Sequence, residues 1–197
     1  MVVSGEDDYQ PALVEGEADR FVVLSGASGA GKSTLLTELG RRGYRIYEEA
    51  GRQVIKEQQY IGGDAIPSAD AARFLELTAS RSIHNLISAA RAGGLAFFDR
   101  GIVDQVSAFE YFRIPLPQHL ANAAARLRYR QTVFMMPPWR EIFANDSERR
   151  HSFADAVSYY ETLLRTYERF GYRAIIVPQA VIAMRADFVI AHLAVPA

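Results

Sequence analysis

The sequence predicts a doubly wound α/β domain of three layers, in which a parallel β-sheet lies between two layers of helices. Three observations support this prediction. Short apolar runs alternate with longer segments of helical periodicity along most of the chain. Several of these runs are apolar at every position, as is typical of strands buried on both faces of a parallel sheet. A glycine-rich turn follows the first run, at a place where open α/β sheets bind anions.

The first half of the chain alternates between the two types of element and then continues into one long helix. The predicted elements are, in order, strand 21–25, helix 32–42, strand 44–47, helix 50–60 and helix 71–92. Gly62, Gly63 and Pro67 favour a loop before the long helix, and the pair Gly93 and Gly94 ends it.

The second half contains three further strands. Its predicted elements are, in order, strand 95–98, helix 102–112, helix 118–129, strand 132–136, helix 153–170, strand 172–177 and helix 179–193. Pro137 and Pro138 end the fourth strand because proline has no N–H for the ladder. Gly171 ends the amphipathic helix that precedes the last strand. The predicted sheet therefore has five strands.

The chain divides into a short arm and one domain. Residues 1–20 are acidic and lack an apolar period, so we expect a flexible amino-terminal arm. Residues 21–197 contain no repeat and no linker-like segment, so we expect them to form a single domain. Hydrophobic residues make up 49% of the 197 residues, which excludes wholesale disorder.

Composition also excludes several classes of partner. A net charge of -1 without a basic run argues against a nucleic-acid partner. No apolar run approaches the roughly 20 residues needed to cross a bilayer, and the acidic start does not resemble a signal peptide. The absence of cysteine excludes thiolate metal sites, and the four histidines lack ligand spacing. We therefore expect a cytoplasmic protein without a membrane partner.

The turn between the first strand and the first helix matches the pattern G-x-x-x-x-G-K-[ST]. Glycines let successive backbone N–H groups point toward one anion, and the following helix presents its positive end there. Lys32 would reach the β- and γ-phosphates of a nucleotide, and Ser33 would supply a hydroxyl oxygen to Mg²⁺. The candidate nucleotide-binding residues are Gly26, Ala27, Ser28, Gly29, Ala30, Gly31, Lys32, Ser33 and Thr34.

A carboxylate follows the apolar residues of the third strand. Asp99 has the placement of a Walker B residue, which predicts a ligand for Mg²⁺ or for a water on that ion. Arg100 comes next and is a candidate catalytic and substrate-binding residue, because Gly101 keeps the turn open toward the cleft. The alternative is that Asp99 caps the next helix, a role that Asp104 could take instead.

Charged residues also follow the second strand, at the carboxyl edge of the sheet where ligands bind. Glu48, Glu49 and Arg52 occupy this position. A carboxylate there can accept the proton of an attacking hydroxyl, and an arginine can hold an anionic substrate. One helical turn brings Glu49 and Arg52 to the same pocket. The alternative is that the acidic residues complement the helix dipole while Arg52 is solvated.

A polar segment over residues 145–151 predicts a short lid. Its Arg149 and Arg150 are catalytic candidates, because arginines on a closing segment can neutralise charge in a phosphoryl-transfer transition state. The alternative is a solvated charge cluster at the start of a helix.

The order of these motifs resembles a known group of proteins. The motifs are Gly26 to Ser33, Glu49-Ala50-Gly51-Arg52, Phe98-Asp99-Arg100-Gly101 with Asp104, Asp146 to Arg150, Gly171-Tyr172 and Val177-Pro178. This order resembles the predicted AAA-type ATPases of the P-loop kinase-like group, which are related to the ribosylnicotinamide-kinase domain of bacterial bifunctional NAD regulators.

The resemblance covers about residues 21–193 and implies a strand order of 2-3-1-4-5 with a short lid. It also implies binding of ATP with Mg²⁺ and transfer of the γ-phosphoryl group to a small acceptor. By this similarity Glu49 and Arg52 match an E-x-x-R element. Asp99 and Arg100 match a D-R-G element, and Arg149 or Arg150 matches the lid arginine.

The sequence thus predicts a P-loop kinase that uses ATP and Mg²⁺ and phosphorylates a small, nucleoside-like molecule. Glu49 or Asp99 would act as the base, and Lys32 with the lid arginines would stabilise charge. ATP is the expected nucleotide because no N/TKxD guanine motif occurs. The alternative is a regulatory ATPase or GTPase switch that acts through a protein partner. Formation of a homodimer stays open.

Overall fold

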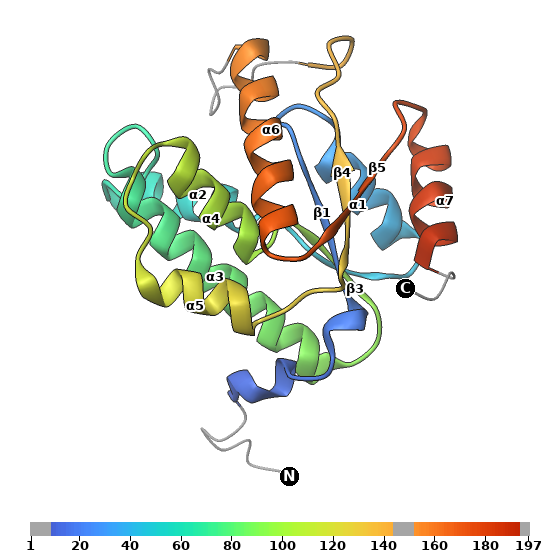
Figure 1. Cartoon of the computed structure of the whole chain (residues 1–197), viewed down its shortest axis with the longest axis horizontal. Helices are drawn as coiled ribbons and strands as arrows, with labels where there is room; N and C mark the ends of the chain where they lie inside the picture. Colours follow the sequence, from blue (N-terminus) through green and yellow to red (C-terminus); the bar gives the residue numbers. More distant parts are fainter. Residues whose placement is uncertain (1–8, 144–151, 194–197) are drawn as a thin grey trace.

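The computed structural model of the chain describes residues 9–143 and 152–193. Five strands form one sheet in the order β2-β3-β1-β4-β5, and all neighbouring strands are parallel (Figure 1). The strands are β1 (Phe21–Gly26), β2 (Arg45–Tyr47), β3 (Ala96–Asp99), β4 (Thr132–Met136) and β5 (Arg173–Ile176). The predicted α/β architecture and strand order are confirmed.

The helices lie on both faces of this sheet. They are α1 (Lys32–Arg41), α2 (Ala50–Ile61), α3 (Ala71–Ala92), α4 (Ile102–Tyr111), α5 (Gln118–Arg126), α6 (Phe153–Arg169) and α7 (Ile182–Leu193). Helices α1 and α7 pack together on one face, while α3, α4, α5 and α6 cover the other, with α2 against α3 (Figure 1). The connection after β1 leads to β2 on one side of β1, and the connection after β3 leads to β4 on the other side. This reversal creates a topological switch point at the carboxyl ends of β1, β3 and β4.

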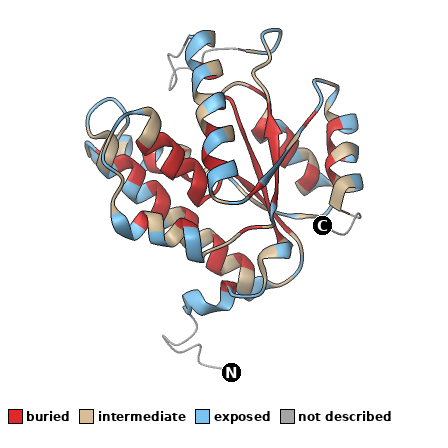
Figure 2. Cartoon of the chain, in the orientation of Figure 1, coloured by how far each residue is buried: buried red, intermediate tan, exposed pale blue. Residues whose placement is uncertain are grey.

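The burial of the strands follows from this layering. Every residue of β1, β3 and β4 is buried, whereas the edge strands β2 and β5 contain exposed positions (Figure 2). Central strands covered by helices on both faces must be mostly apolar, as the sequence indicates, and the polar residues Ser25 and Asp99 lie near the carboxyl ends of β1 and β3. Phe21, Phe97 and Phe134 are fully buried and fill the space between the sheet and its helices.

Two helices, α5 and α7, differ from the prediction by more than one residue, because tertiary contacts hold the flanking residues elsewhere. Helix α5 ends at Arg126, and the N–H of Tyr129 donates to the hydroxyl of Tyr172 at 3.2 Å. Helix α7 begins only at Ile182, after a connection in which the side-chain amide of Gln179 donates to the carbonyl of Pro138 at 2.9 Å. None of the described helices is long and apolar enough to cross a membrane.

The residues just before β1 are structured. Short 3₁₀ helices cover Pro11–Val14 and Ala18–Arg20, and the first of them packs against α3. The side chain of Val14 is buried in the main core. Residues 9–20 of the expected arm thus contact the domain through the buried Val14 and through Arg20, whose guanidinium donates to the carbonyl of Ala90 at 3.3 Å.

Strands β1 and β4 approach each other most closely where β1 ends. Gly26 has a φ of +128°, and a Cβ atom on it would lie 2.2 Å from the carbonyl oxygen of Met136. The next residue, Ala27, donates its N–H to the same oxygen at 3.1 Å. Only glycine therefore permits the loop that follows β1 to leave the sheet at this point.

We expect Gly26→Ala to lower the free energy of unfolding by about 3 kcal/mol, because the new methyl group meets backbone that cannot move and the φ value becomes strained. Gly43→Ala is the matched control, since Gly43 also has a positive φ of +92° but has open space around it. It should cost about 1 kcal/mol. Urea denaturation of the two variants measures the difference, and equal losses would contradict the steric explanation.

Candidate functional site

The glycine-rich loop connects β1 to α1 with three glycines in positive-φ conformations. Gly26, Gly29 and Gly31 have φ values of +128°, +72° and +76°. Gly31 is the N-cap residue of α1, so the positive end of the helix dipole lies at the loop. Lys32 is 4% exposed, and its ammonium group donates to the carbonyl oxygens of Ala27 at 2.7 Å and Gly26 at 3.2 Å. The lysine thus folds back across its own loop.

The outer side of the loop is covered by two other parts of the chain. A Cβ atom on Gly29 would lie 3.1 Å from the ring of Phe143. A Cβ atom on Gly31 would lie 2.8 Å from the guanidinium of Arg185, which donates to the carbonyl of Ala30 at 3.0 Å. No local signal in the sequence predicts the contact between Arg185 and Ala30, because residues so far apart in sequence meet only when α7 packs on α1.

Ser33 and Asp99 lie together at the inner side of the loop. The hydroxyl of Ser33 donates to Oδ2 of Asp99 at 3.0 Å, and Oδ1 of Asp99 is buried without a hydrogen-bond partner among residues 9–143 and 152–193. Burial raises the pKa of Asp99, and the nearby charge of Glu49 raises it further, while Lys32 and Arg100 oppose this shift. A buried oxygen left without a donor is an orphan that a cation would satisfy.

These residues fit Mg²⁺ held jointly with phosphate groups. No cluster of three or more potential metal-ligating side chains occurs within residues 9–143 and 152–193. Mg²⁺ needs only one or two carboxylates when substrate phosphates and waters complete its octahedral coordination. The carboxylate of Asp99 and the hydroxyl of Ser33 are such a partial set.

Arg100 is held in one position by backbone and side chain together. Its φ is +72°, an unfavourable left-handed conformation for a residue other than glycine, and its N–H donates to the carbonyl of Leu24 at 2.9 Å. Its guanidinium lies 3.4 Å from Glu49 and 3.0 Å from Asp104. Burial would lower the pKa of Arg100, but the carboxylates of Glu49, Asp104 and Asp99 contribute to a net increase. The side chain therefore stays charged.

Asp104 is the anchor of Arg100. Its buried carboxylate accepts hydrogen bonds from the hydroxyl groups of Ser25 and Tyr167 at 2.6 Å each, from the N–H of Gly101 at 2.8 Å and from Arg100 at 3.0 Å. Burial and the adjacent Asp104 raise the pKa of Tyr167 well above its usual range, so the phenol stays a donor. Asp104 takes the capping role left open in the sequence, and Asp99 is free of it.

Glu49 occupies the N-cap position of α2 between two arginines. Its carboxylate lies 3.4 Å from Nε of Arg100 and 4.0 Å from Nε of Arg52. Glu49 therefore lies where it can complement the dipole of α2, as the alternative interpretation of the sequence expects. Its side chain also contacts Arg100. Glu48 is exposed, and it borders a small pocket together with Tyr47 and Asn85.

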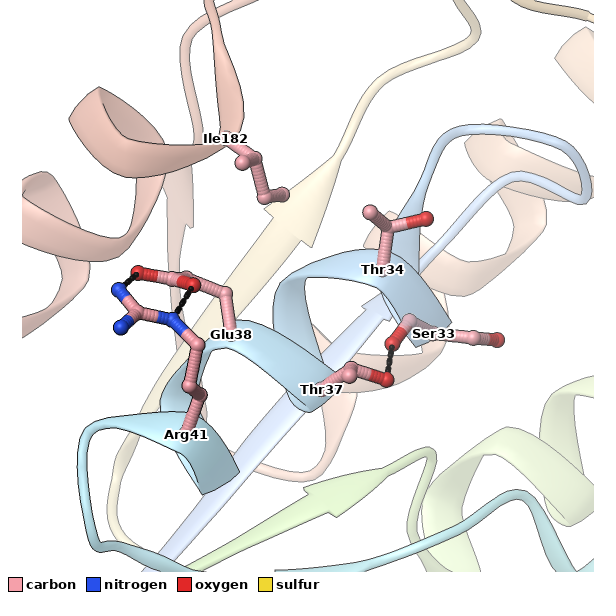
Figure 3. A pocket seen from close by; sticks show the side chains of 6 residues that line it. All are labelled: Ser33, Thr34, Thr37, Glu38, Arg41 and Ile182. Atoms are coloured by element: carbon pink, nitrogen blue, oxygen red, sulfur yellow. Dashed lines mark hydrogen bonds and ion pairs between the residues drawn. The ribbon is translucent and has the colours of Figure 1, made fainter.

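A cavity of about 410 Å³ lies beside the phosphate loop, between α1 and the start of α7 (Figure 3). Ser33 and Thr34 form one end, and the hydrogen-bonded pair Glu38 and Arg41 forms the other. Ile182 faces them from α7. Thr34 thus belongs to this cavity.

The predicted residues of the phosphate loop, the second strand and the third strand gather at one edge of the sheet. Lys32, Ser33, Asp99, Arg100 and Glu49 form a chain of neighbouring charges and hydroxyls there. Arg149 and Arg150 lie outside the described residues, so the proposed lid stays a prediction from the sequence.

Solved structures share this fold at low sequence identity. A NadR protein solved in complex with NR matches with a TM-score of 0.68 and 19% identity over 94% of this chain. The chain spans 54% of the length of that NadR structure. The thymidylate kinase of Ehrlichia chaffeensis matches with a TM-score of 0.58 and 13% identity, covering 90% of this chain and 100% of the kinase. A deoxyadenosine kinase from M. mycoides with bound dATP matches with a TM-score of 0.51 and 15% identity, covering 88% and 98% respectively.

These likenesses show that the chain shares the fold of these proteins. No curated protein sequence matches the chain significantly. A family model described as an AAA domain matches residues 21–185, from the first residue of β1 into α7. Because this match covers most of the sequence, the chain belongs to the AAA domain family.

Proposed function

We propose that the protein is a phosphotransferase that uses ATP and Mg²⁺ to phosphorylate a small, nucleoside-like molecule. The observation that carries this proposal is the pair formed by Ser33 and Asp99, at 3.0 Å, beside a glycine-rich loop and its buried Lys32. Hydroxyl, carboxylate and ammonium groups around one loop are the set that phosphoryl transfer needs. The similarity of fold to a thymidylate kinase and a deoxyadenosine kinase supports the choice of acceptor class.

The nucleotide would lie along the loop and the start of α1. The ammonium group of Lys32 would exchange two loop carbonyls for phosphate oxygens, which are stronger acceptors. Ser33 and Asp99 would hold Mg²⁺, which, when bound, offsets the negative charge of the phosphates. The cavity between α1 and α7 would take the nucleoside part, with the hydroxyl groups of Thr34 and Thr37 on its wall.

The acceptor would bind on the other side of Asp99, at the ends of β2 and β3. Glu49 would accept a hydrogen bond from the acceptor hydroxyl and orient it for attack. Arg52 and Arg100 flank this carboxylate, so the three groups together carry one net positive charge. This charge would stabilise the negative charge that develops during phosphoryl transfer. Arg100 cannot swing away, because Asp104 and its left-handed backbone fix it.

Turnover of ATP with Mg²⁺, alone and with a panel of nucleosides that includes nicotinamide riboside, tests the proposal. One acceptor should raise ADP release at least about tenfold, since an oriented hydroxyl outcompetes water. Tight ATP binding with slow turnover that no acceptor stimulates would instead support the regulatory switch, and a search for a protein partner would follow.

Replacing Lys32 by alanine should weaken ATP binding about 10- to 100-fold, because a charge-assisted hydrogen bond to phosphate is lost. Lys56→Ala is the matched control, since Lys56 is the other lysine of the chain and is exposed on α2. Calorimetric titration with ATP and Mg²⁺ measures both affinities. An unchanged affinity of the Lys32 variant would remove the loop from the proposal.

Asp99→Asn should reduce kcat about 100-fold and abolish the response to Mg²⁺, because a neutral amide is a poor ligand for a hard cation.

The same variant should raise Tm at pH 7. Burial raises the pKa of Asp99, so its ionised form destabilises the folded chain, and asparagine removes that charge while keeping an acceptor for Ser33.

Asp64→Asn on the surface is the control for this variant, because Asp64 pairs only with the exposed Arg73 in the described structure. Full activity of the Asp99 variant, or a fall in its Tm with retained activity, would mean that Asp99 has a structural role instead.

A further inference from the structure

Two basic side chains are buried in the described part of the chain, and both contact the phosphate loop. Lys32 is 4% exposed and Arg185 is 3% exposed. Lys32 donates to the carbonyls at the start of the loop, whereas Arg185 donates to the carbonyl of Ala30 near its end, at 3.0 Å. One cation comes from the loop's own helix and the other from α7, more than a hundred residues later in the sequence.

The guanidinium of Arg185 lacks the partner that a buried charge requires. Within residues 9–143 and 152–193 no carboxylate lies at ion-pair distance from it, and its Nε is buried without a hydrogen bond. The ring of Trp139 lies 5.9 Å from its guanidinium carbon. Arg100, which is also largely buried, has two carboxylates instead. Burial lowers the pKa of Arg185 because the charged form loses hydration.

The hydrogen bond to Ala30 also fixes the direction of one peptide unit. In a planar trans peptide the C=O of Ala30 and the N–H of Gly31 point in opposite directions. Since the carbonyl of Ala30 points toward Arg185, the N–H of Gly31 points away from Arg185. Gly31 must be glycine for this approach, because a Cβ atom would lie 2.8 Å from the guanidinium.

We propose that Arg185 is a positioning residue for polyphosphate binding, which turns the N–H of Gly31 into the phosphate loop and places a buried positive charge behind it. The electrostatic partner of this charge is the polyphosphate group of a nucleotide on the other side of the loop. The inference rests on the proposed nucleotide site and assigns a role to α7 in it.

A contribution of Arg185 to packing alone would have a different signature. Its stem and the Trp139 contact would then stabilise α7 whether or not a ligand is bound, and loss of the guanidinium would lower Tm without changing affinity for phosphates. Arg42 offers a matched comparison, because it ties α1 to α7 through Asp187 at 2.5 Å and the carbonyl of Ala183 at 3.1 Å, away from the loop.

The test measures the dissociation constant of tripolyphosphate and of ATP with Mg²⁺, together with Tm without ligand, for the full chain and three variants. Arg185→Met should weaken both ligands about tenfold or more, because it removes the charge and the donor but keeps an apolar stem. Arg185→Lys, which keeps the charge, should recover affinity to within about threefold of the original chain. Arg42→Met should lower Tm while binding tripolyphosphate as the original chain does.

Two results would overturn the proposal. The first is an Arg185→Met variant with the original affinity for tripolyphosphate. The second is an Arg42→Met variant that loses as much affinity as the Arg185 variant, since loosening of α7 would then explain both. If Arg185→Met does not fold, the comparison of Arg185→Gln with Arg185→Lys takes its place. Equal affinities of these two variants for tripolyphosphate would show that the charge at this position does not contribute to binding.

Failure of this inference and failure of the proposed function give different results. If the original chain binds neither tripolyphosphate nor ATP, the nucleotide site itself is wrong, and the role of Arg185 falls with it. If the original chain binds both ligands and the Arg185 variants bind them equally well, only the role of Arg185 is wrong.

Discussion

The arrangement of the site depends on the hydrogen bonds that the buried carboxylate of Asp104 accepts. A buried carboxylate needs donors for its lone pairs, and here they come from Ser25 at the end of β1, from the turn after β3 and from Tyr167 on α6. These contacts fix the end of β1, the start of α4 and the face of α6 relative to one another. Arg100 is the fourth donor and is thereby held at the carboxyl edge of the sheet.

Negatively and positively charged side chains alternate along the edge of the sheet, starting from Asp104. Arg100 connects Asp104 to Glu49, and Glu49 in turn lies near Arg52. Asp99 is next to Arg100 in the chain, yet its carboxylate pairs with the hydroxyl of Ser33 rather than with a cation. Asp99 thus separates a region rich in guanidinium groups from the glycine-rich loop, and the proposed function assigns the acceptor to the first region and the nucleotide to the second.

Much of the fold follows from local patterns. The predominantly apolar runs in β1, β3 and β4 mark central strands because helices cover both their faces, and the glycine-rich motif marks the loop because its spacing is specific. The ends of α5 and α7 were less predictable. Tyr129 and Gln179 leave the helical pattern to bond with residues of distant segments, and no local signal reports such contacts.

Periodicity, the position of strand ends and the phosphate-loop motif therefore suffice for the architecture and for Lys32, Ser33, Asp99 and Glu49 as candidates, since each is read from nearby residues. The partners of these groups come from long-range packing. Asp104 could be read locally only as a helix cap. Its bond to Tyr167 exists because α4 packs against α6, and its bond to Ser25 exists because β1 lies next to β3, the strand before α4. Arg185 reaches Ala30 because α7 packs on α1. Arginine is usually exposed, but this packing buries Arg185, and no carboxylate of the described residues pairs with its charge.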